Sequence, residues 1–306
     1  MPLTKISIII PFYKGEIFIV NLLDSLELSL QSSKKKISVE TVIVLDSLLS
    51  DITIERKMYE YTDLNVKIIN NNNNMGVAYS RSKGMEYATG DYVTFIDQDD
   101  FVSISYFRSL EDKLSKKTID IIWMNGYLYF TKNETRIMMF PIKPTFTLKT
   151  FIYNNIIPTP SFLIVKRERI LKYNISFYQQ DISDKIVGVD DWFFILQLLI
   201  KKTDDFVIEY VDSANVFYCL HLENYSHNIN KMTNSAANLL AYISSKYDLH
   251  SYKIKDRITT LFYMEYFYKN RIKAVLFHPV LFFKTLFFYL KDVNRVCRLI
   301  IHLIKY

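Results

Sequence analysis

Residues 90–100 read Gly-Asp-Tyr-Val-Thr-Phe-Ile-Asp-Gln-Asp-Asp, and this stretch decides the fold. Residues 92–96 combine aromatic and β-branched side chains, which is typical of a buried strand. Three carboxylates, Asp97, Asp99 and Asp100, follow where that strand is expected to end. Because carboxylates this close repel one another, each resists ionisation unless a positive charge lies between them. A divalent cation bound through oxygen, Mg²⁺ or Mn²⁺, would supply that charge, whereas the alternative is a solvated turn that caps the next helix.

Upstream of this stretch, short apolar runs alternate with segments of helical periodicity. Strands are expected at residues 6–10, 39–45, 66–69 and 92–96, and helices at residues 17–30, 52–61 and 77–88. This alternation, with continuously apolar strands, predicts an α/β fold with a mostly parallel central sheet. Ligands bind such sheets at the carboxyl ends of the strands. Three candidate segments fall at those ends, namely residues 11–13, 46–51 and 97–100.

Beyond residue 119 the expected elements become shorter. Asn125-Gly126 is a typical turn signal, so residues 119–124 and 127–131 are expected to form two separate strands. A helix is expected at residues 189–200, and further strands at residues 137–140, 162–165, 206–208 and 214–219. The sequence from residue 231 onward has a helical character throughout. We therefore expect an α/β domain at residues 1–230 and a helical C-terminal region at residues 231–306.

The composition predicts a well-packed core and a reducing compartment. The chain has 306 residues, of which 50% are hydrophobic, with 6 Gly, 23 Tyr and 22 Phe, and this excludes a disordered or collagen-like chain. Cys219 and Cys297 form neither a disulfide framework nor a metal-site spacing. Residues 6–10 are too short an apolar run for a signal peptide, and no run reaches the ~20 apolar residues that span a bilayer. We expect a cytoplasmic protein that is soluble or attached to a membrane surface.

The formal net charge of +6 is concentrated in the C-terminal tail. From Arg271 to Tyr306, seven Lys or Arg residues stand against one acid, Asp292, whereas the rest of the chain is balanced. Residues 274–290 and 293–304 place these basic residues beside large apolar ones, a pattern that suits a helix lying on an anionic membrane surface. The alternative is a helical appendage that packs on protein. No nucleic-acid-binding module accompanies the charge, so no nucleic acid partner is expected.

Four segments occur in the order in which they occur in family 2 glycosyltransferases with the GT-A fold. Residues 7–14, 74–84 and 90–100 resemble that family's first strand and loop, its Asn-x-Gly…Ala-Arg-Asn-x-Gly segment and its strand with metal motif. Residues 188–192, Gly-Val-Asp-Asp-Trp, stand where the family carries an acidic pair at the start of a helix. The resemblance covers roughly residues 5–228. It implies an inverting transfer of a sugar from a nucleotide-sugar donor, a UDP-sugar in the first place, with Mn²⁺ or Mg²⁺ as cofactor.

The resemblance also implies the roles of individual residues. The metal ligands would be Asp99, Asp100 and His221. The residues that bind the donor nucleotide would be Pro11, Tyr13, Asp46, Ser47, Asn74, Arg81 and Asp97. An acceptor hydroxyl needs a carboxylate to take its proton, and Asp191 is expected to be this base, with Asp190 as an orienting residue or substitute. The acceptor would be a glycan or a lipid-linked molecule of bacterial surface polysaccharide synthesis.

Several of these residues also have a structural alternative. Pro11 and Tyr13 suit strand termination and core filling, and Arg81 suits a helix surface. The acidic pair at 190–191 suits an ordinary first helical turn, and His221 suits a loop without a role. These alternatives stay open on the sequence alone.

One segment departs from the family pattern. Residues 46–51 read Asp-Ser-Leu-Leu-Ser-Asp, where the family usually has Asp-Asp-Gly-Ser-x-Asp. Ser47 therefore replaces the acid that often pairs with uracil, so the base that is recognised stays open. Ser47 or Ser50 is equally suited to cap the following helix.

Two rival functions remain. A non-catalytic member of the same fold that scaffolds other enzymes at a membrane would explain the altered segment at 46–51. A nucleotidyltransferase would also need carboxylates and a metal, but residues 11–15 are a poor version of its Gly-rich phosphate loop. The sugar, the acceptor, the linkage and the oligomeric state are not readable from the sequence.

Overall fold

The computed structural model describes residues 3–269, except 35–36, 48–56, 72, 116–117, 154, 204, 222–227 and 250–251, together with the single residues 280 and 286. The chain divides into two compact units, and each is described by itself. The first unit consists of Met1–Met139, Ile157–Gln179 and Gln197–His221, and the second of Phe140–Ile156, Gln180–Leu196 and Leu222–Tyr306. Each unit thus draws on separate stretches of sequence, and the domain boundary expected after residue 230 stays a prediction.

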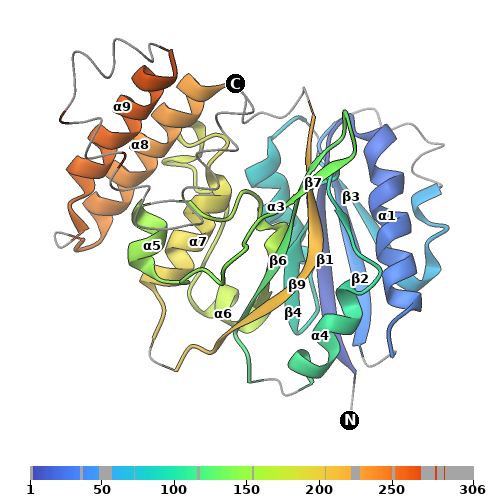
Figure 1. Cartoon of the computed structure of the whole chain (residues 1–306). Helices are drawn as coiled ribbons and strands as arrows, with labels where there is room; N and C mark the ends of the chain where they lie inside the picture. The colour runs from blue at the N-terminus through green and yellow to red at the C-terminus, as the bar shows by residue number, and fades with distance from the viewer. Residues whose placement is uncertain are drawn as a thin grey trace. The chain divides into compact units, whose positions relative to one another are not determined.

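The first unit is built on a mixed sheet (Figure 1). Its described strands are β1 (Thr4–Phe12), β2 (Ile37–Leu45), β3 (Val66–Asn70), β4 (Tyr92–Phe95), β5 (Phe101–Val102), β6 (Ile121–Phe130), β7 (Thr135–Met138), β8 (Leu163–Lys166) and β9 (Ile208–Leu220). Their order is β3-β2-β1-β4-β8-β6-β9-β5, with β7 paired to β6. The long ladders β1–β2, β2–β3, β1–β4 and β6–β9 are parallel, whereas β8, β7 and β5 join through shorter antiparallel ladders. The predicted α/β fold with a mostly parallel central sheet is confirmed.

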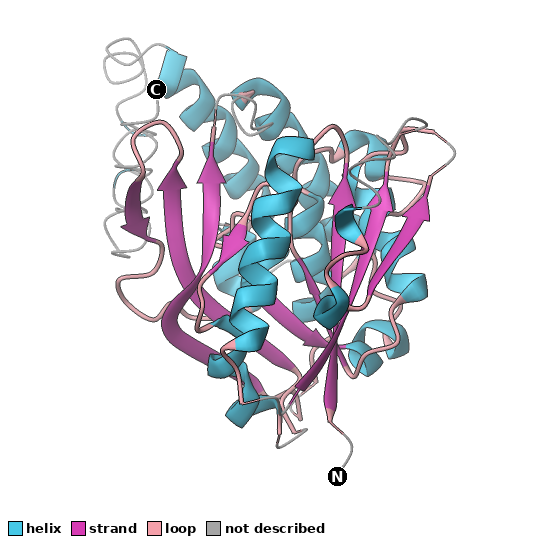
Figure 2. Cartoon of the chain, turned by 90° about the vertical axis from the view of Figure 1, so that its right-hand side faces the viewer, coloured by secondary structure: helices cyan, strands magenta, loops and turns pink. Residues whose placement is uncertain are grey.

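Helices cover both faces of this sheet. Figure 1 shows α1 (Glu16–Gln31) and α3 (Val77–Tyr87) on opposite sides of it, and in Figure 2 α1 lies in front of the strands. The first unit also contains α4 (Tyr106–Leu114), α6 (Arg167–Lys172) and the 3-10 turns η1 (Thr62–Leu64) and η2 (Pro160–Phe162). The second unit contains α5 (Leu148–Tyr153), η3 (Ser183–Lys185), α8 (Ile229–Lys246) and α9 (Ile254–Lys269), and α7 (Asp190–Ile200) joins the two units.

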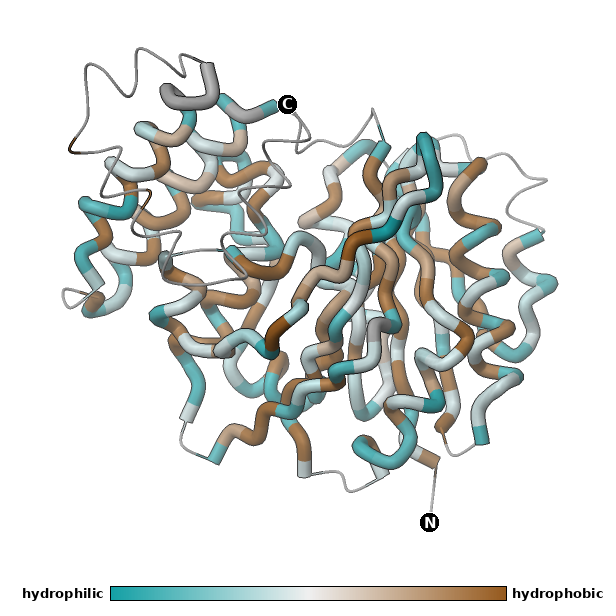
Figure 3. Tube along the Cα trace, viewed as in Figure 1, coloured by the Kyte–Doolittle hydropathy of each residue, from teal (hydrophilic) through white to brown (hydrophobic). Residues whose placement is uncertain are grey.

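The parallel strands are apolar because helices bury them on both faces. Ile8, Ile9 and Ile10 are completely buried in β1, although successive side chains point to opposite faces. Figure 3 shows the same pattern as hydrophobic residues along the central strands, with hydrophilic residues interspersed on α1. Continuous apolar runs in the sequence therefore predict these strands well.

One expected turn is wrong. Asn125-Gly126 does not end a strand, because β6 runs through it without interruption and pairs with β9, which is also one strand rather than two. The register between β6 and β9 shifts at Met124/Asn125 and again at Asn125/Gly126. A Cβ atom on Gly126 would lie 2.2 Å from the carbonyl oxygen of Val216. Glycine is therefore needed here for the close approach of two backbones at a bulge.

Several expected elements lie outside the described residues. Half of the helix predicted at 52–61, residues 52–56, lies outside the described residues, and the tail from residue 270 onward is described only at residues 280 and 286. Among the helices that are described, none combines the length and the apolar character needed to cross a membrane. The prediction that the tail binds a membrane surface therefore stays untested.

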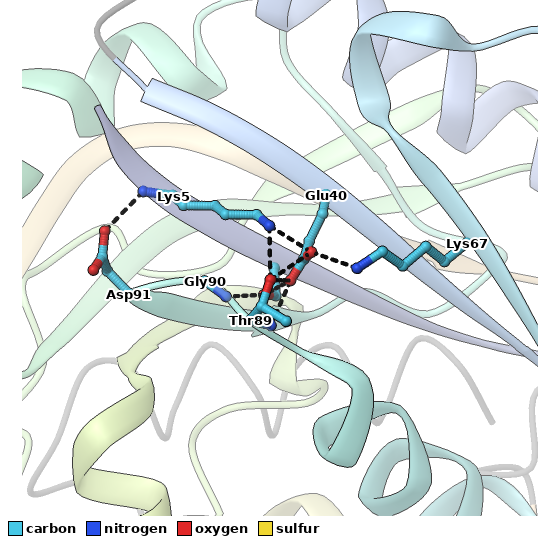
Figure 4. Close-up of polar contacts among 7 residues, drawn as sticks. Lys5, Glu40, Lys67, Thr89, Gly90 and Asp91 are labelled. Carbon is cyan, nitrogen blue, oxygen red and sulfur yellow. Dashed lines mark hydrogen bonds and ion pairs between the residues drawn. The ribbon is translucent and has the colours of Figure 1, made fainter. Parts of the chain in front are cut away.

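A buried carboxylate joins the parallel strands near their amino ends (Figure 4). Glu40 on β2 is fully buried, yet it lies 2.7 Å from Nζ of Lys5 on β1 and 3.0 Å from Nζ of Lys67 on β3. Ser7 Oγ donates to it at 2.6 Å, and the backbone N–H of Thr89 donates at 2.5 Å. Burial alone would raise the pKa of Glu40, but these donors outweigh it and hold the pKa well below its ordinary value. Glu40 thus ties three strands to the segment before β4.

We expect Glu40→Gln to lower the free energy of unfolding by about 2 kcal/mol at pH 7, since hydrogen bonds to a buried charged group are weakened. The folded-state pKa of Glu40 lies below its unfolded value, so this contribution is fully present above about pH 4.5 and is lost as the pH falls further. The difference between the variant and the wild type should therefore shrink below pH 4.5. Urea unfolding at pH 7 and pH 4 checks this, with Glu86→Gln on the exposed side of α3 as the control.

Candidate functional site

Three loops of the first unit meet at the carboxyl ends of the parallel strands. The N–H of Asp46 donates to Phe12 O at 2.8 Å, and the N–H of Ile96 donates to Ile9 O at 3.0 Å, so β2 and β4 stay in register with β1 up to their last residues. The segments 11–13, 46–47 and 97–100 consequently lie at one edge of the sheet. This is the edge at which the sequence predicts a ligand site.

Asp97, which is partly exposed, forms an ion pair with the buried Arg81 from α3. Arg81 is only 4% exposed, and its guanidinium lies over the ring of Phe177 at 5.2 Å from the centroid. Thr159 Oγ1 donates to the other oxygen of Asp97 at 2.9 Å. Burial raises the pKa of Asp97, and the charge of Arg81 partly offsets this. The structure therefore excludes the alternative that Arg81 is a surface residue. It also brings together Arg81 and Asp97, two of the residues predicted to bind the nucleotide.

Asp100 is the anchor of the acidic turn. It is 1% exposed, and both of its oxygens accept hydrogen bonds, from Ser161 Oγ at 2.8 Å and from the N–H of Cys219 at 3.1 Å. Burial, followed by the charges of Asp99 and Asp97, raises the pKa of Asp100 well above its ordinary value. A positive charge bound beside this turn would favour the ionised carboxylates.

Asp99 has a different environment, because it faces the end of β9. Its Oδ2 lies 2.7 Å from Nε2 of His221, and the side chains of the two residues are 21% and 15% exposed. The ring of Phe18, from the first turns of α1, stacks on the imidazole at 5.0 Å with an interplanar angle of 20°. The structure thus brings Asp99 and His221 together from distant parts of the sequence and orients the imidazole.

The acidic residues of this site differ in how well they could bind a divalent metal ion. No group of three or more His, Cys, Asp or Glu side chains in the described part of the chain is arranged to hold a metal ion. The Asp100 oxygens already accept two hydrogen bonds, which leaves Asp99 and His221 as the more open pair. Mg²⁺ and Mn²⁺ sites in nucleotide enzymes commonly use one or two protein ligands and complete the shell with phosphate oxygens and water. Asp99 and His221 fit such a shared site.

Asp46 organises the loop that leads into α3. Its two oxygens accept hydrogen bonds from Asn71 Nδ2 at 2.8 Å, from the N–H of Met75 at 2.8 Å and from the N–H of Gly76 at 2.7 Å. Gly76 has a φ of +86°, which glycine adopts without strain and which lets the chain turn into α3. Asn74 on the same loop is exposed. Asp46 is therefore occupied by protein donors, and it shapes the loop that carries Asn74.

Tyr13 lies on the loop between β1 and α1. Its side chain is 40% exposed, so core filling does not explain it, whereas Pro11 two residues earlier is buried. Nζ of Lys14 lies 5.2 Å from the centroid of the Tyr13 ring. The amide of Gln98 contacts the backbone of Tyr13 through both of its polar atoms. An exposed aromatic ring next to the acidic turn can stack on a planar ligand.

Four residues of this region were not expected from the sequence. They are Phe18, Gln98, Thr159 and Ser161, which contact His221, Tyr13, Asp97 and Asp100 respectively. Three of them carry no pattern that separates them from ordinary polar or apolar residues. Gln98 lies inside the acidic motif, so its position was the one available signal.

Asp190 and Asp191 lie in the second unit, in the first turn of α7. Both are buried, at 4% and 8% exposure. Asp191 Oδ1 accepts a hydrogen bond from the N–H of Trp192 at 2.6 Å, and Asn155 Nδ2 lies 3.5 Å from Asp191 Oδ2. Carboxylates are favoured at a helix N-terminus, where backbone N–H groups are unpaired. The predicted roles of this pair in proton transfer stay predictions.

The motifs and their geometry agree with a comparison against protein families. The sequence model of Glycosyl transferase family 2 matches residues 7–173, more than half of the chain. The chain belongs to this family. The match includes the acidic turn, Arg81 and the loops at 11–13 and 46–47. The resemblance seen in the sequence is therefore confirmed.

Curated glycosyltransferases are similar to this chain over part of their length. A cholesterol galactosyltransferase of Borreliella burgdorferi is 26% identical over 220 residues, which are 65% of this chain and 56% of the relative. The chain spans less than two thirds of the length of the first curated relatives that it matches. A poly(ribitol-phosphate) beta-N-acetylglucosaminyltransferase of Staphylococcus aureus, TarS, is 26% identical over 182 residues, which are 58% of this chain and 30% of the relative.

Solved structures show the fold. Staphylococcus aureus TarS in complex with UDP-GlcNAc matches with a TM-score of 0.64 at 18% identity, over 90% of this chain and 76% of that chain. The mannosyltransferase PcManGT of Pyrobaculum calidifontis, in complex with GDP-Man and Mn²⁺, matches with a TM-score of 0.54 at 14% identity, over 80% of this chain and 65% of that chain. The expected GT-A fold of this family 2 chain is thereby confirmed.

We expect Asp46→Ala to lower the free energy of unfolding by about 1–3 kcal/mol, because it leaves the N–H groups of Met75 and Gly76 and the amide of Asn71 without their acceptor. Urea unfolding measures this loss. Ser47→Ala is the neighbouring control, since it leaves all three of these hydrogen bonds in place. Equal stability of the two variants would contradict the organising role of Asp46.

Proposed function

We propose that this chain transfers a sugar from a UDP-sugar donor to an acceptor hydroxyl with inversion at the anomeric carbon. The observation that carries the proposal is the pairing of Asp99 with His221 at 2.7 Å, beside the Asp97–Arg81 ion pair and the exposed Tyr13. The UDP-GlcNAc in the TarS neighbour supports the choice of donor class. The family membership argues against the rival nucleotidyltransferase.

The nucleoside would occupy the edge formed by the loops after β1 and β2. In this proposal Tyr13 stacks on the base, which its exposure allows, and Pro11 fixes the backbone before it. Ser47 and Asn74 offer a hydroxyl and an amide to polar atoms of the nucleoside. Asp46 contributes by holding the loop of Asn74 in place, through the donors that it accepts.

The diphosphate would lie next to Asp99 and His221. Arg81 is charged at any accessible pH, and in this proposal its ion pair with Asp97 lies beside the ribose and diphosphate position. Asp99 and His221 would hold a divalent ion together with the diphosphate, and the Mn²⁺ in the PcManGT neighbour supports this. When bound, such an ion stabilises the negative charge that develops on a departing nucleoside diphosphate. Asp100 stabilises the acidic turn through its hydrogen bonds with Ser161 and Cys219.

The acceptor side of the reaction is assigned to the acidic pair of α7. In this proposal Asp191 takes the proton of the acceptor hydroxyl as it attacks, and Asp190 orients it. We propose a glycan or lipid-linked acceptor of bacterial surface polysaccharide synthesis, handled at the cytoplasmic face of the membrane. The basic and apolar tail that motivates this location lies outside the described residues.

We expect the wild-type protein to bind UDP more tightly than GDP or CDP, and only in the presence of Mn²⁺ or Mg²⁺. Asp99→Asn should weaken metal-dependent UDP binding at least tenfold, because it removes the charge that the site offers to the cation. Isothermal titration of the full chain with each nucleotide measures this. Asp112→Asn on the exposed face of α4 is the control. If a folded wild-type sample bound none of the nucleotides, a non-catalytic scaffold would be the better proposal.

Asp191→Asn should keep the wild-type affinity for UDP and lose more than 100-fold in the rate of transfer, since only the proton acceptor is removed. Release of UDP from the donor with and without acceptor measures the rate, and titration measures the affinity. Asp184→Asn, an exposed acid of the same unit, is the matched control. Full turnover of Asp191→Asn would show that another group is the base.

A further inference from the structure

The loop between β1 and α1 is held by a side chain from the acidic motif itself. Gln98 Oε1 accepts a hydrogen bond from the N–H of Tyr13 at 2.8 Å, and Gln98 Nε2 donates to the carbonyl oxygen of Tyr13 at 3.0 Å. One amide thus satisfies both backbone groups of a single residue 85 positions away. Such a paired contact fixes the orientation of the Tyr13 peptide groups as well as their position.

Gly15 makes room for this contact. A Cβ atom at Gly15 would lie 2.3 Å from Cδ and Nε2 of Gln98, closer than any real side chain approaches. The φ of Gly15 is −114°, a value that any residue adopts, so backbone freedom is not the reason for glycine here. The space that the Gln98 amide occupies is the reason.

The loop also contains a backbone conformation that is unusual for its residue type. Lys14, between the two contact points, has a φ of +49°, in the left-handed region that non-glycine residues rarely adopt. Residues in that region persist when the surrounding structure determines their backbone. Here the Gln98 amide fixes the backbone of Tyr13, the residue before Lys14, and packs against Gly15, the residue after it.

We propose that Gln98 is a positioning residue that couples the metal and diphosphate side of the donor site to the base side. Gln98 is flanked by Asp97 and Asp99, so a movement of the acidic turn is transmitted through the amide to Tyr13. This inference rests on the proposed function and deepens it. It assigns the affinity for the nucleoside part of the donor to the contact between Gln98, Tyr13 and Gly15.

Two single variants break the contact from opposite sides. Gln98→Ala removes the amide, and Gly15→Ala displaces it by adding a methyl group. Each should weaken Mn²⁺-dependent UDP binding at least fivefold and raise the donor KM, with kcat at saturating donor changed less than twofold. Gln98→Glu should resemble Gln98→Ala, because a carboxylate cannot donate to the Tyr13 carbonyl.

The double variant separates this coupling from a general loss of structure. In Gln98→Ala the space beside Gly15 is empty, so Gly15→Ala should add no further loss of UDP affinity. Hydrogen exchange of the peptide that contains the Tyr13 amide, measured without nucleotide, should be faster in both single variants than in the wild type. Gln31→Ala at the exposed end of α1 is the control for both measurements.

The outcomes are distinguishable. If the wild type binds UDP and both single variants bind it with the same affinity, the coupling is overturned. Losses of UDP affinity that add up in the double variant would also overturn it. Unchanged hydrogen exchange at Tyr13 would overturn the contact itself. Absence of any nucleotide binding by the wild-type protein would instead overturn the proposed function, and with it the assignment of nucleoside affinity to this contact.

Discussion

The burial of carboxylates within the parallel half of the sheet is the constraint on which the other features depend. A buried charge is tolerated only when donors from its surroundings pair with it. Glu40 meets this requirement toward the amino ends of the strands, and Asp46 and Asp100 meet it at the carboxyl ends, where the partly exposed Asp97 also pairs with protein donors. The donors come from loops and strands far apart in sequence, so satisfying each charge also fixes the segments that carry those donors.

This constraint divides the acidic residues of the turn into different tasks. Asp97 and Asp100 each accept hydrogen bonds on both oxygens from protein groups, and they hold the turn against α3, the segment at 159–161 and β9. Asp99 instead pairs with a histidine whose ring stacks on Phe18, and it is more exposed than Asp100. The glutamine between them reaches the opposite loop. In this short motif Asp100 is buried and hydrogen-bonded, Asp97 forms an ion pair, Gln98 contacts the backbone of Tyr13, and Asp99 pairs with His221.

The sequence predicts much of this arrangement, for a physical reason in each case. Continuous apolar runs predict β1, β2 and β4 because these strands are buried on both faces. The meeting of residues 11–13, 46–47 and 97–100 follows from parallel strands that end at one edge, whereas Arg81 was expected only from the family resemblance. Asn125-Gly126 misled because the same dipeptide that favours a turn also suits a bulge. Ser161 and Phe18 could not be found, since their partners are set by tertiary contacts that leave no local pattern. The placement of the acidic pair at 190–191 likewise depends on tertiary structure.

The bulge on β9 determines which residue reaches the acidic turn. Asp212, Ser213 and Asn215 have no partner residue on β6 in the ladder, and the buried Asn215 is held there by hydrogen bonds with Ser103, Ser105 and Ser109. Side chains alternate between the two faces of a strand. The number of residues after the bulge therefore determines toward which face each later side chain points and how far along the strand it lies. The loss of one residue between Asn215 and His221 would exchange inward and outward side chains. Insertions and deletions in this short stretch are therefore constrained by spacing, whatever amino acids they involve.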